Sequence, residues 1–131
     1  MAGIKRFEDL IAWQKARHLA KDVYASTRAG QFAKDFGLSG QIQRAAVSVM
    51  SNIAEGFERA SRPEFQRYLL ISKASCAELR SQLYVAVDLG YVSPGDFARL
   101  MKAANEVARI IGGLRMAMKK PRNDPKKDSE N

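Results

Sequence analysis

The sequence predicts an all-α protein, an antiparallel up-down-up-down four-helix bundle formed by a single domain. Apolar residues recur at intervals of three and four along four segments of about 20 to 28 residues, which is the period of amphipathic helices. Glycine and proline fall between these segments, where they interrupt helices. No useful stretch alternates apolar and polar residues as a half-buried strand does. Short connections favour antiparallel packing of successive helices.

The first helix is predicted over about residues 7–29, and Gly30 ends it. Its apolar face consists of Trp13, Ala16, Leu19, Ala20, Val23 and Tyr24. Residues 31–38 are predicted to form a loop, in which Gly37 takes a left-handed backbone conformation.

The second helix is predicted over about residues 40–60, with Ser39 as its N-cap. Its apolar residues cover roughly 200° of the helical wheel, whereas a bundle helix needs little more than about 100°. The surplus consists of Val47, Met50 and Ala54. Either this helix lies unusually deep in the bundle or another subunit covers its edge, because large exposed apolar patches are uncommon. The pattern favours self-association, as a dimer or a ring.

The third helix is predicted over about residues 62–89. It begins with a capping box, in which Ser61 is followed three residues later by Glu64, and Pro63 stands in the first turn. Gly90 is expected to end it as a C′ residue.

The fourth helix is predicted over about residues 94–119 and repeats this start signal with Ser93, Pro94 and Asp96. Gly112 and Gly113 lie inside it, and each weakens a helix by roughly 1 kcal/mol. We therefore expect a close packing contact at these two glycines.

The composition assigns residues 1–120 to the bundle and residues 121–131 to a polar tail that we expect to be disordered. No apolar run approaches the roughly 20 residues that span a bilayer, so no membrane association is expected. No secretory signal is visible at the N-terminus. The only cysteine, Cys76, excludes an internal disulfide. These features predict a cytoplasmic protein.

Charge is the first unusual feature of the chain. The sequence has 22 Lys and Arg against 14 Asp and Glu, which gives a net charge of +8. Residues 120–131 contribute only +1 of this excess. A basic domain favours acidic partners, with RNA or DNA first, although solubility alone is an alternative.

The basic residues form lines on three helices, and these lines contain no acid. They are Arg17, Lys21 and Arg28 on the first helix, Arg62, Lys73 and Arg80 on the third, and Lys102 and Arg109 on the fourth. Rows at one or two helical turns can neutralise several phosphates, but they lack aromatic residues that would stack on bases. The pattern therefore predicts contacts with the phosphate backbone, and the alternative is a set of solvated helix faces.

Residues 41–56, QIQRAAVSVMSNIAEG, closely resemble the signature of the four-helix bundle proteins encoded in bacterial 23S rRNA intervening sequences. The resemblance extends to almost the whole chain before the tail. It includes residues 7–10 with Trp13, residues 36–38, Glu78, Leu79, Gln82, Leu83 and residues 89–91. Met50 and Ala33 depart from the family, which usually has proline at these two places. Met50 in place of proline should straighten the second helix.

The resemblance implies an antiparallel four-helix bundle that assembles into a homopentamer. A group similar in fold, the accessory variability determinant proteins of diversity-generating retroelements, binds nucleic acid and a reverse transcriptase, so a protein partner is the alternative to nucleic acid. Candidate residues for the oligomer interface or the signature are Arg44, Val47, Met50, Ser51, Asn52, Ala54 and Glu55.

No catalytic centre, metal site or cofactor site is predicted. His18 is the only histidine, and Cys76 stands alone on an apolar face, where a buried hydrophobic role is expected. Ser51, Asn52 and Glu55 form one polar cluster, but no nucleophile is identifiable for Glu55 to activate. Hydrogen bonds between helices or subunits are favoured there, with Arg44 as an ion partner for a carboxylate. The sequence thus predicts a non-enzymatic homo-oligomer that binds nucleic acid, or a scaffold that binds another protein.

Overall fold

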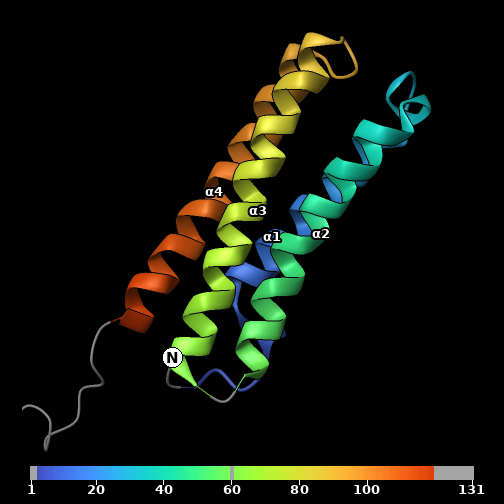
Figure 1. Cartoon of the computed structure of the whole chain (residues 1–131). Helices are drawn as coiled ribbons and strands as arrows, with labels where there is room; N and C mark the ends of the chain where they lie inside the picture. The colour runs from blue at the N-terminus through green and yellow to red at the C-terminus, as the bar shows by residue number, and fades with distance from the viewer. Residues whose placement is uncertain (1–2, 60, 120–131) are drawn as a thin grey trace, which may run out of the picture.

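The computed structural model describes residues 3–59 and 61–119, and the tail expected to be disordered lies outside these residues. The described residues contain four α-helices, two short 3-10 helices and no strand, which confirms the all-α four-helix fold (Figure 1). The elements are η1 (Phe7–Asp9), α1 (Ile11–Thr27), η2 (Phe32–Lys34), α2 (Phe36–Glu58), α3 (Arg62–Asp88) and α4 (Pro94–Lys119).

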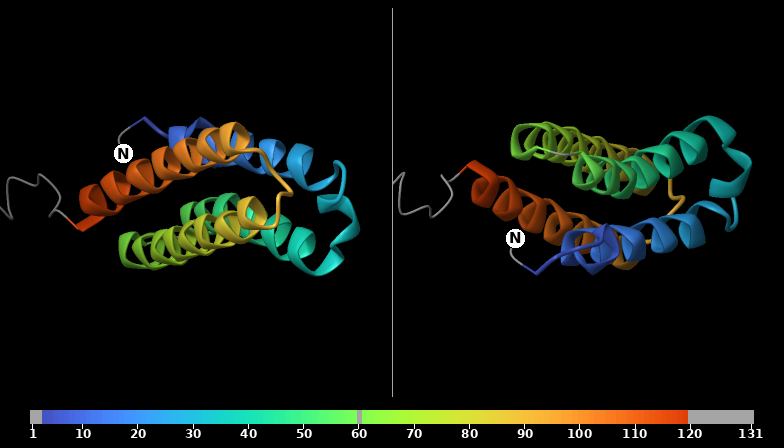
Figure 2. Two further views of the ribbon diagram at one scale, coloured as in Figure 1. Left: turned by 90° about the horizontal axis from the view of Figure 1, so that it is seen from above. Right: turned by 90° about the horizontal axis from the view of Figure 1, so that it is seen from below.

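Each helix packs against the next one in the chain, and α4 also packs against α1. Figure 2 shows the result as two layers, with α1 and α4 in one and α2 and α3 in the other. All four helices contribute aliphatic side chains to one core because each has an apolar stripe at helical spacing. The most deeply buried of these side chains include Leu19, Ile42, Ile53, Leu69, Leu79, Leu83, Leu100 and Ile111.

The first helix starts later than the sequence predicts. Residues 7–9 form a separate 3-10 turn, and Leu10 is extended, with φ −73° and ψ 126°. This break turns the Leu10 side chain into the core and allows Phe7 to pack edge-on against Trp13, with 5.2 Å between ring centroids. Tertiary packing thus ends a helical pattern that continues in the sequence.

The second helix starts earlier than predicted, at Phe36, because Asp35 rather than Ser39 is its N-cap. The Asp35 carboxylate accepts a hydrogen bond from the backbone N–H of Leu38 at 3.1 Å. Its other oxygen accepts one from the Tyr91 hydroxyl at 3.0 Å, and Tyr91 stacks on the buried ring of Phe32. Gly37 lies inside this helix and has no positive φ, so its predicted left-handed turn is wrong.

The structure contains the helix-ending signals that the sequence predicts at the start and end of α3 and at the start of α4. Ser61 Oγ accepts from the Glu64 N–H at 3.3 Å, and Ser93 Oγ accepts from the Asp96 N–H at 3.0 Å. Gly90 has φ +73°, which an L-residue adopts at a cost, and the N–H of the next residue, Tyr91, bonds back to the carbonyl of the last helical turn.

The close glycine contact occurs in α2 and not, as predicted, in α4. A Cβ atom on Gly56 would lie 2.6 Å from Tyr68 Cβ and 3.1 Å from a ring carbon of Phe65, so α2 and α3 approach closely there. Gly113 has no atom within 4 Å of such a position, and Gly112 meets only the end of a lysine side chain. The prediction for Gly112 and Gly113 is therefore wrong.

Among the described helices, none combines the length and apolar character required to cross a membrane.

Candidate nucleic-acid interface

Five of the predicted basic residues lie where α3 and α4 meet, and they are Arg62, Lys73 and Arg80 on α3 with Lys102 and Arg109 on α4. Arg80 lies on the edge of α3 that faces α4, where its Nη1 donates to Asn105 Oδ1 at 3.0 Å. Lys73 lies two turns earlier on this edge, and its Nζ is 3.7 Å from the place that a Cβ of Gly112 would occupy. At about 100° per residue, Lys102 and Arg109 lie within roughly 60° of Asn105 on α4.

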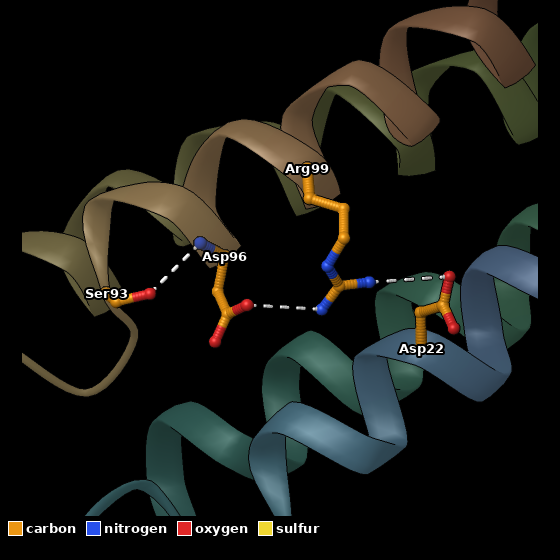
Figure 3. A network of polar contacts seen from close by, with 4 residues as sticks. All are labelled: Asp22, Ser93, Asp96 and Arg99. Atoms are coloured by element: carbon orange, nitrogen blue, oxygen red, sulfur yellow. Dashed lines mark hydrogen bonds and ion pairs between the residues drawn. The ribbon is translucent and has the colours of Figure 1, made fainter.

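The basic residues of α1 lie on a different side. The edge of α1 that faces α4 carries Lys15, which pairs with Glu106 at 3.2 Å, and Asp22, which pairs with Arg99 at 3.8 Å (Figure 3). Arg17, Lys21 and Arg28 lie roughly 130° around the helix from this edge, at about 100° per residue. Within one subunit, the predicted residues therefore form two surfaces.

Five of the eight predicted residues are exposed and form no ion pair, side-chain hydrogen bond or cation–π contact with any residue that the structure describes. They are Lys21, Arg28, Lys73, Lys102 and Arg109. The other three have neighbours within the bundle. Arg17 stacks on the Trp13 ring at 5.6 Å, and Arg62 donates to the carbonyl of Ala117 near the end of α4 at 2.8 Å. Arg80, as described, bonds to Asn105.

The structure adds two arginines that the sequence prediction missed. Arg67 and Arg115 line an open pocket of about 230 Å³ between the first turns of α3 and the last turns of α4, together with Pro63, Gln66 and Leu70. Arg115 is half-buried, so it does not belong to an outer row of charges. No sequence signal joins two arginines that are 48 residues apart, and the packing of α3 on α4 brings them together.

Some polar signature residues of α2 bond toward α3, and others are exposed to solvent. Asn52 donates to the carbonyl and Oγ of Ser48 at 2.8 and 3.0 Å, and Ser48 bonds to Ser75 of α3 at 2.8 Å, so this part of the signature joins two helices. Ser51 and Glu55 are exposed. The structure thus does not gather Ser51, Asn52 and Glu55 into one pocket.

The two charged signature residues have different surroundings. Glu55 pairs with Arg59, the C-cap residue of α2, at 3.7 Å. The exposed Arg44 side chain lies over Gly40, where a Cβ would be 3.1 Å from Nη1. Arg44 forms no ion pair with any carboxylate that the structure describes, so the expected partner is not found within these residues.

The apolar edge of α2 is largely covered within the subunit. Met50 is half-buried and packs on the core, and Ala54 is also half-buried, whereas Val47 is 38% exposed. A larger exposed apolar surface lies on α3, and we call it the α3 outer face. Its large side chains are 42–56% exposed, and it comprises Leu70, Ile71, Tyr84, Val85 and Leu89, with Ala74, Ala77 and Ser81 exposed between them.

Cys76 and His18 do not form a reactive site in this arrangement. Cys76 is fully buried, its Sγ donates to the carbonyl of Ala104 at 3.1 Å, and burial raises the pKa of its thiol. His18 is exposed on α1. Among the described residues, no three His, Cys, Asp or Glu side chains are grouped so that they could hold a metal ion.

The fold and the surface together define a small basic four-helix bundle. The sequence profile of the 23S rRNA-intervening sequence protein family matches residues 8–113, so this chain belongs to that family. Among solved structures, a protein of unknown function from the S23 ribosomal protein family of Bacteroides thetaiotaomicron is similar in fold. It is 20% identical, with a TM-score of 0.75, and the match covers 81% of this chain and 96% of that one. A comparison with curated proteins gives no significant match.

Proposed function

We propose that this chain is a cytoplasmic, non-enzymatic protein that binds nucleic acid through the phosphate backbone. Its subunit would be an antiparallel up-down-up-down bundle, assembled into a homo-oligomer, and the family resemblance favours a pentamer. The nucleic-acid proposal rests on five exposed basic side chains that form no ion pair with a described residue. They are Lys21, Arg28, Lys73, Lys102 and Arg109.

The absence of internal ion pairs matters because a Lys or Arg side chain that already pairs with a carboxylate gains less binding free energy from a phosphate. Each Lys or Arg that neutralises a phosphate releases a counterion, and this release drives binding without reading the base sequence. Oligomerisation would multiply the number of such contacts, because every subunit repeats the same two basic surfaces.

The α3 outer face supports the proposal of self-association. Five large apolar side chains are exposed on α3, which favours a contact with another chain, because large exposed apolar surfaces are uncommon in monomers. Glu78 and Asp88 are exposed on the same arc of the helix and interrupt this apolar surface. Its middle carries Ala74, Ala77 and Ser81, whose small side chains let another helix approach closely. We propose that a second copy of this chain covers this face.

Binding of a structured RNA, measured by gel shift at two salt concentrations, tests the nucleic-acid proposal. We expect affinity to fall steeply with salt and to depend little on sequence, because phosphate contacts dominate. An affinity that does not change with salt would refute backbone binding.

A scaffold that binds another protein is the second candidate, and the same α3 outer face favours it. This would correspond to the protein-binding role that the resemblance to retroelement accessory proteins implies. A chain that remains monomeric, and that binds no RNA at low salt, would favour the scaffold over the nucleic-acid-binding oligomer.

A further inference from the structure

We infer that the pocket between the first turns of α3 and the last turns of α4 binds a phosphate group. Arg67 and Gln66 reach it from α3, and Arg115 reaches it from α4. Guanidinium groups donate hydrogen bonds in a planar fork that matches phosphate oxygens, and two of them line this one pocket.

The state of Arg115 points to a ligand. Arg115 lines the pocket, is half-buried, and forms no hydrogen bond or ion pair with a described residue. Its Nε is closed off from solvent, so the terminal Nη groups are the ones that would bind a ligand in the pocket. Arg80 also has a buried, unpaired Nε, but its Nη1 bonds to Asn105, whereas Arg115 forms no bond of any kind with a described residue.

The electrostatics of the pocket select an anion. None of its lining residues is acidic. It lies between the first turns of α3, where the helix dipole is positive, and the last turns of α4, where it is negative, so the attraction for an anion comes from the two arginines. Lys73 follows Leu70 by one turn on the same helix and adds another positive charge near the seam with α4. An anion here would be attracted by every charged side chain that lines the pocket.

The phosphate could come from a nucleic-acid backbone or from a free phosphorylated compound. The inference deepens the proposed function, and it rests on that function only in assigning the phosphate to nucleic acid. The pocket assignment itself can be tested with inorganic phosphate, without any nucleic acid.

The test is a titration of the full chain with inorganic phosphate at constant ionic strength, followed by NMR. We expect saturable shifts in the backbone amides of residues 64–67, and at least tenfold weaker binding in both Arg67→Gln and Arg115→Gln. Arg67 is exposed, so its replacement does not disturb the core. Lys34→Gln removes one positive charge in η2, outside the pocket and outside the predicted basic rows, and we expect it to bind phosphate within about twofold of the wild type. Unchanged binding in Arg67→Gln and Arg115→Gln, or an equal loss in Lys34→Gln, would overturn the inference.

RNA binding by the same variants identifies the source of the phosphate. A larger loss of RNA affinity in Arg67→Gln than in Lys34→Gln would assign the pocket to the nucleic-acid backbone. Lost phosphate binding with equal RNA affinities would support the pocket as a site for a free phosphorylated compound. A wild-type chain that binds inorganic phosphate in the pocket but no RNA would support the pocket and refute the proposed function.

Discussion

Two glycines inside long helices have opposite expected effects when they are replaced by alanine. Gly56→Ala places a Cβ 2.6 Å from Tyr68 Cβ, so α2 and α3 must separate, and we expect a loss of about 1–3 kcal/mol in the free energy of unfolding. Gly113→Ala meets no atom within 4 Å and should stabilise α4 by up to about 1 kcal/mol. Urea unfolding at one protein concentration measures both. If Gly56→Ala were as stable as the wild type, the close approach of α2 and α3 would be refuted.

The buried thiol of Cys76 should be unreactive in the folded protein. Its pKa is raised from the ordinary value of 9.0, chiefly by burial, so the thiolate is disfavoured in the fold. The stability that goes with a neutral Cys76 thiol is therefore fully present below pH 9.0 and is lost as the pH rises through the pKa of the folded protein. We expect a thiol reagent to modify Cys76 at the rate of unfolding, and faster when urea is added. Rapid modification in the absence of urea would contradict the burial of Cys76.

At the scale of helices, the choice of N-cap for α2 can be tested directly. Asp35→Ala removes the carboxylate that caps the helix, and we expect it to lower the free energy of unfolding by about 1 kcal/mol. Ser39→Ala is the control, because Ser39 lies inside α2 and its small side chain caps nothing. Chemical unfolding of both variants measures the difference. A larger loss in Ser39→Ala would instead support Ser39 as the cap.

The two apolar helix edges make different predictions for self-association. Val85→Glu places a charge on the α3 outer face, and Val47→Glu places one on the edge of α2. Both valines are partly exposed, at 46% and 38%, so neither change should unfold the subunit. We expect Val85→Glu to lower the mass in solution, measured by light scattering, because a charge at a buried contact is costly. Dissociation by Val47→Glu alone would locate the contact on α2.

Local signals in the sequence predicted the helices well where the deciding contacts are local. The caps at Ser61 and Ser93 involve residues only three positions away, and both are found in the structure. The cap of α2 is also local, because Asp35 bonds to the N–H of Leu38, but Ser39 and Gly37 suggested a later start. The bond from the Tyr91 hydroxyl to Asp35, which supports the earlier start, joins residues that are distant in the sequence. The break at Leu10 likewise depends on the core that it enters.

The candidate site shows the same limit. Rows such as Lys102 and Arg109 follow from helical periodicity, and both residues are exposed as a surface role requires. The pairing of Arg67 with Arg115 depends on the packing of α3 on α4 and is invisible to a pattern within one helix. The same packing decides that Gly56, and not Gly113, is the close contact.

At the scale of the whole molecule, the two basic surfaces can be separated by their effects on RNA binding. Lys73→Gln, Lys102→Gln and Arg109→Gln together neutralise the side formed by α3 and α4. Each lost phosphate contact should lower the slope of log affinity against log salt by about 1. The pair Lys21→Gln and Arg28→Gln tests the α1 side in the same assay. A slope that neither set of changes alters would refute phosphate contacts by these residues.

Self-association decides which of these surfaces faces solvent, and the mass of the full chain in solution tests it most directly. Sedimentation at several protein concentrations should give a species heavier than one subunit, because a second copy then covers the α3 outer face. The family resemblance favours five subunits. A single species of one subunit, 14.6 kDa, at every concentration would contradict an assembled nucleic-acid-binding surface.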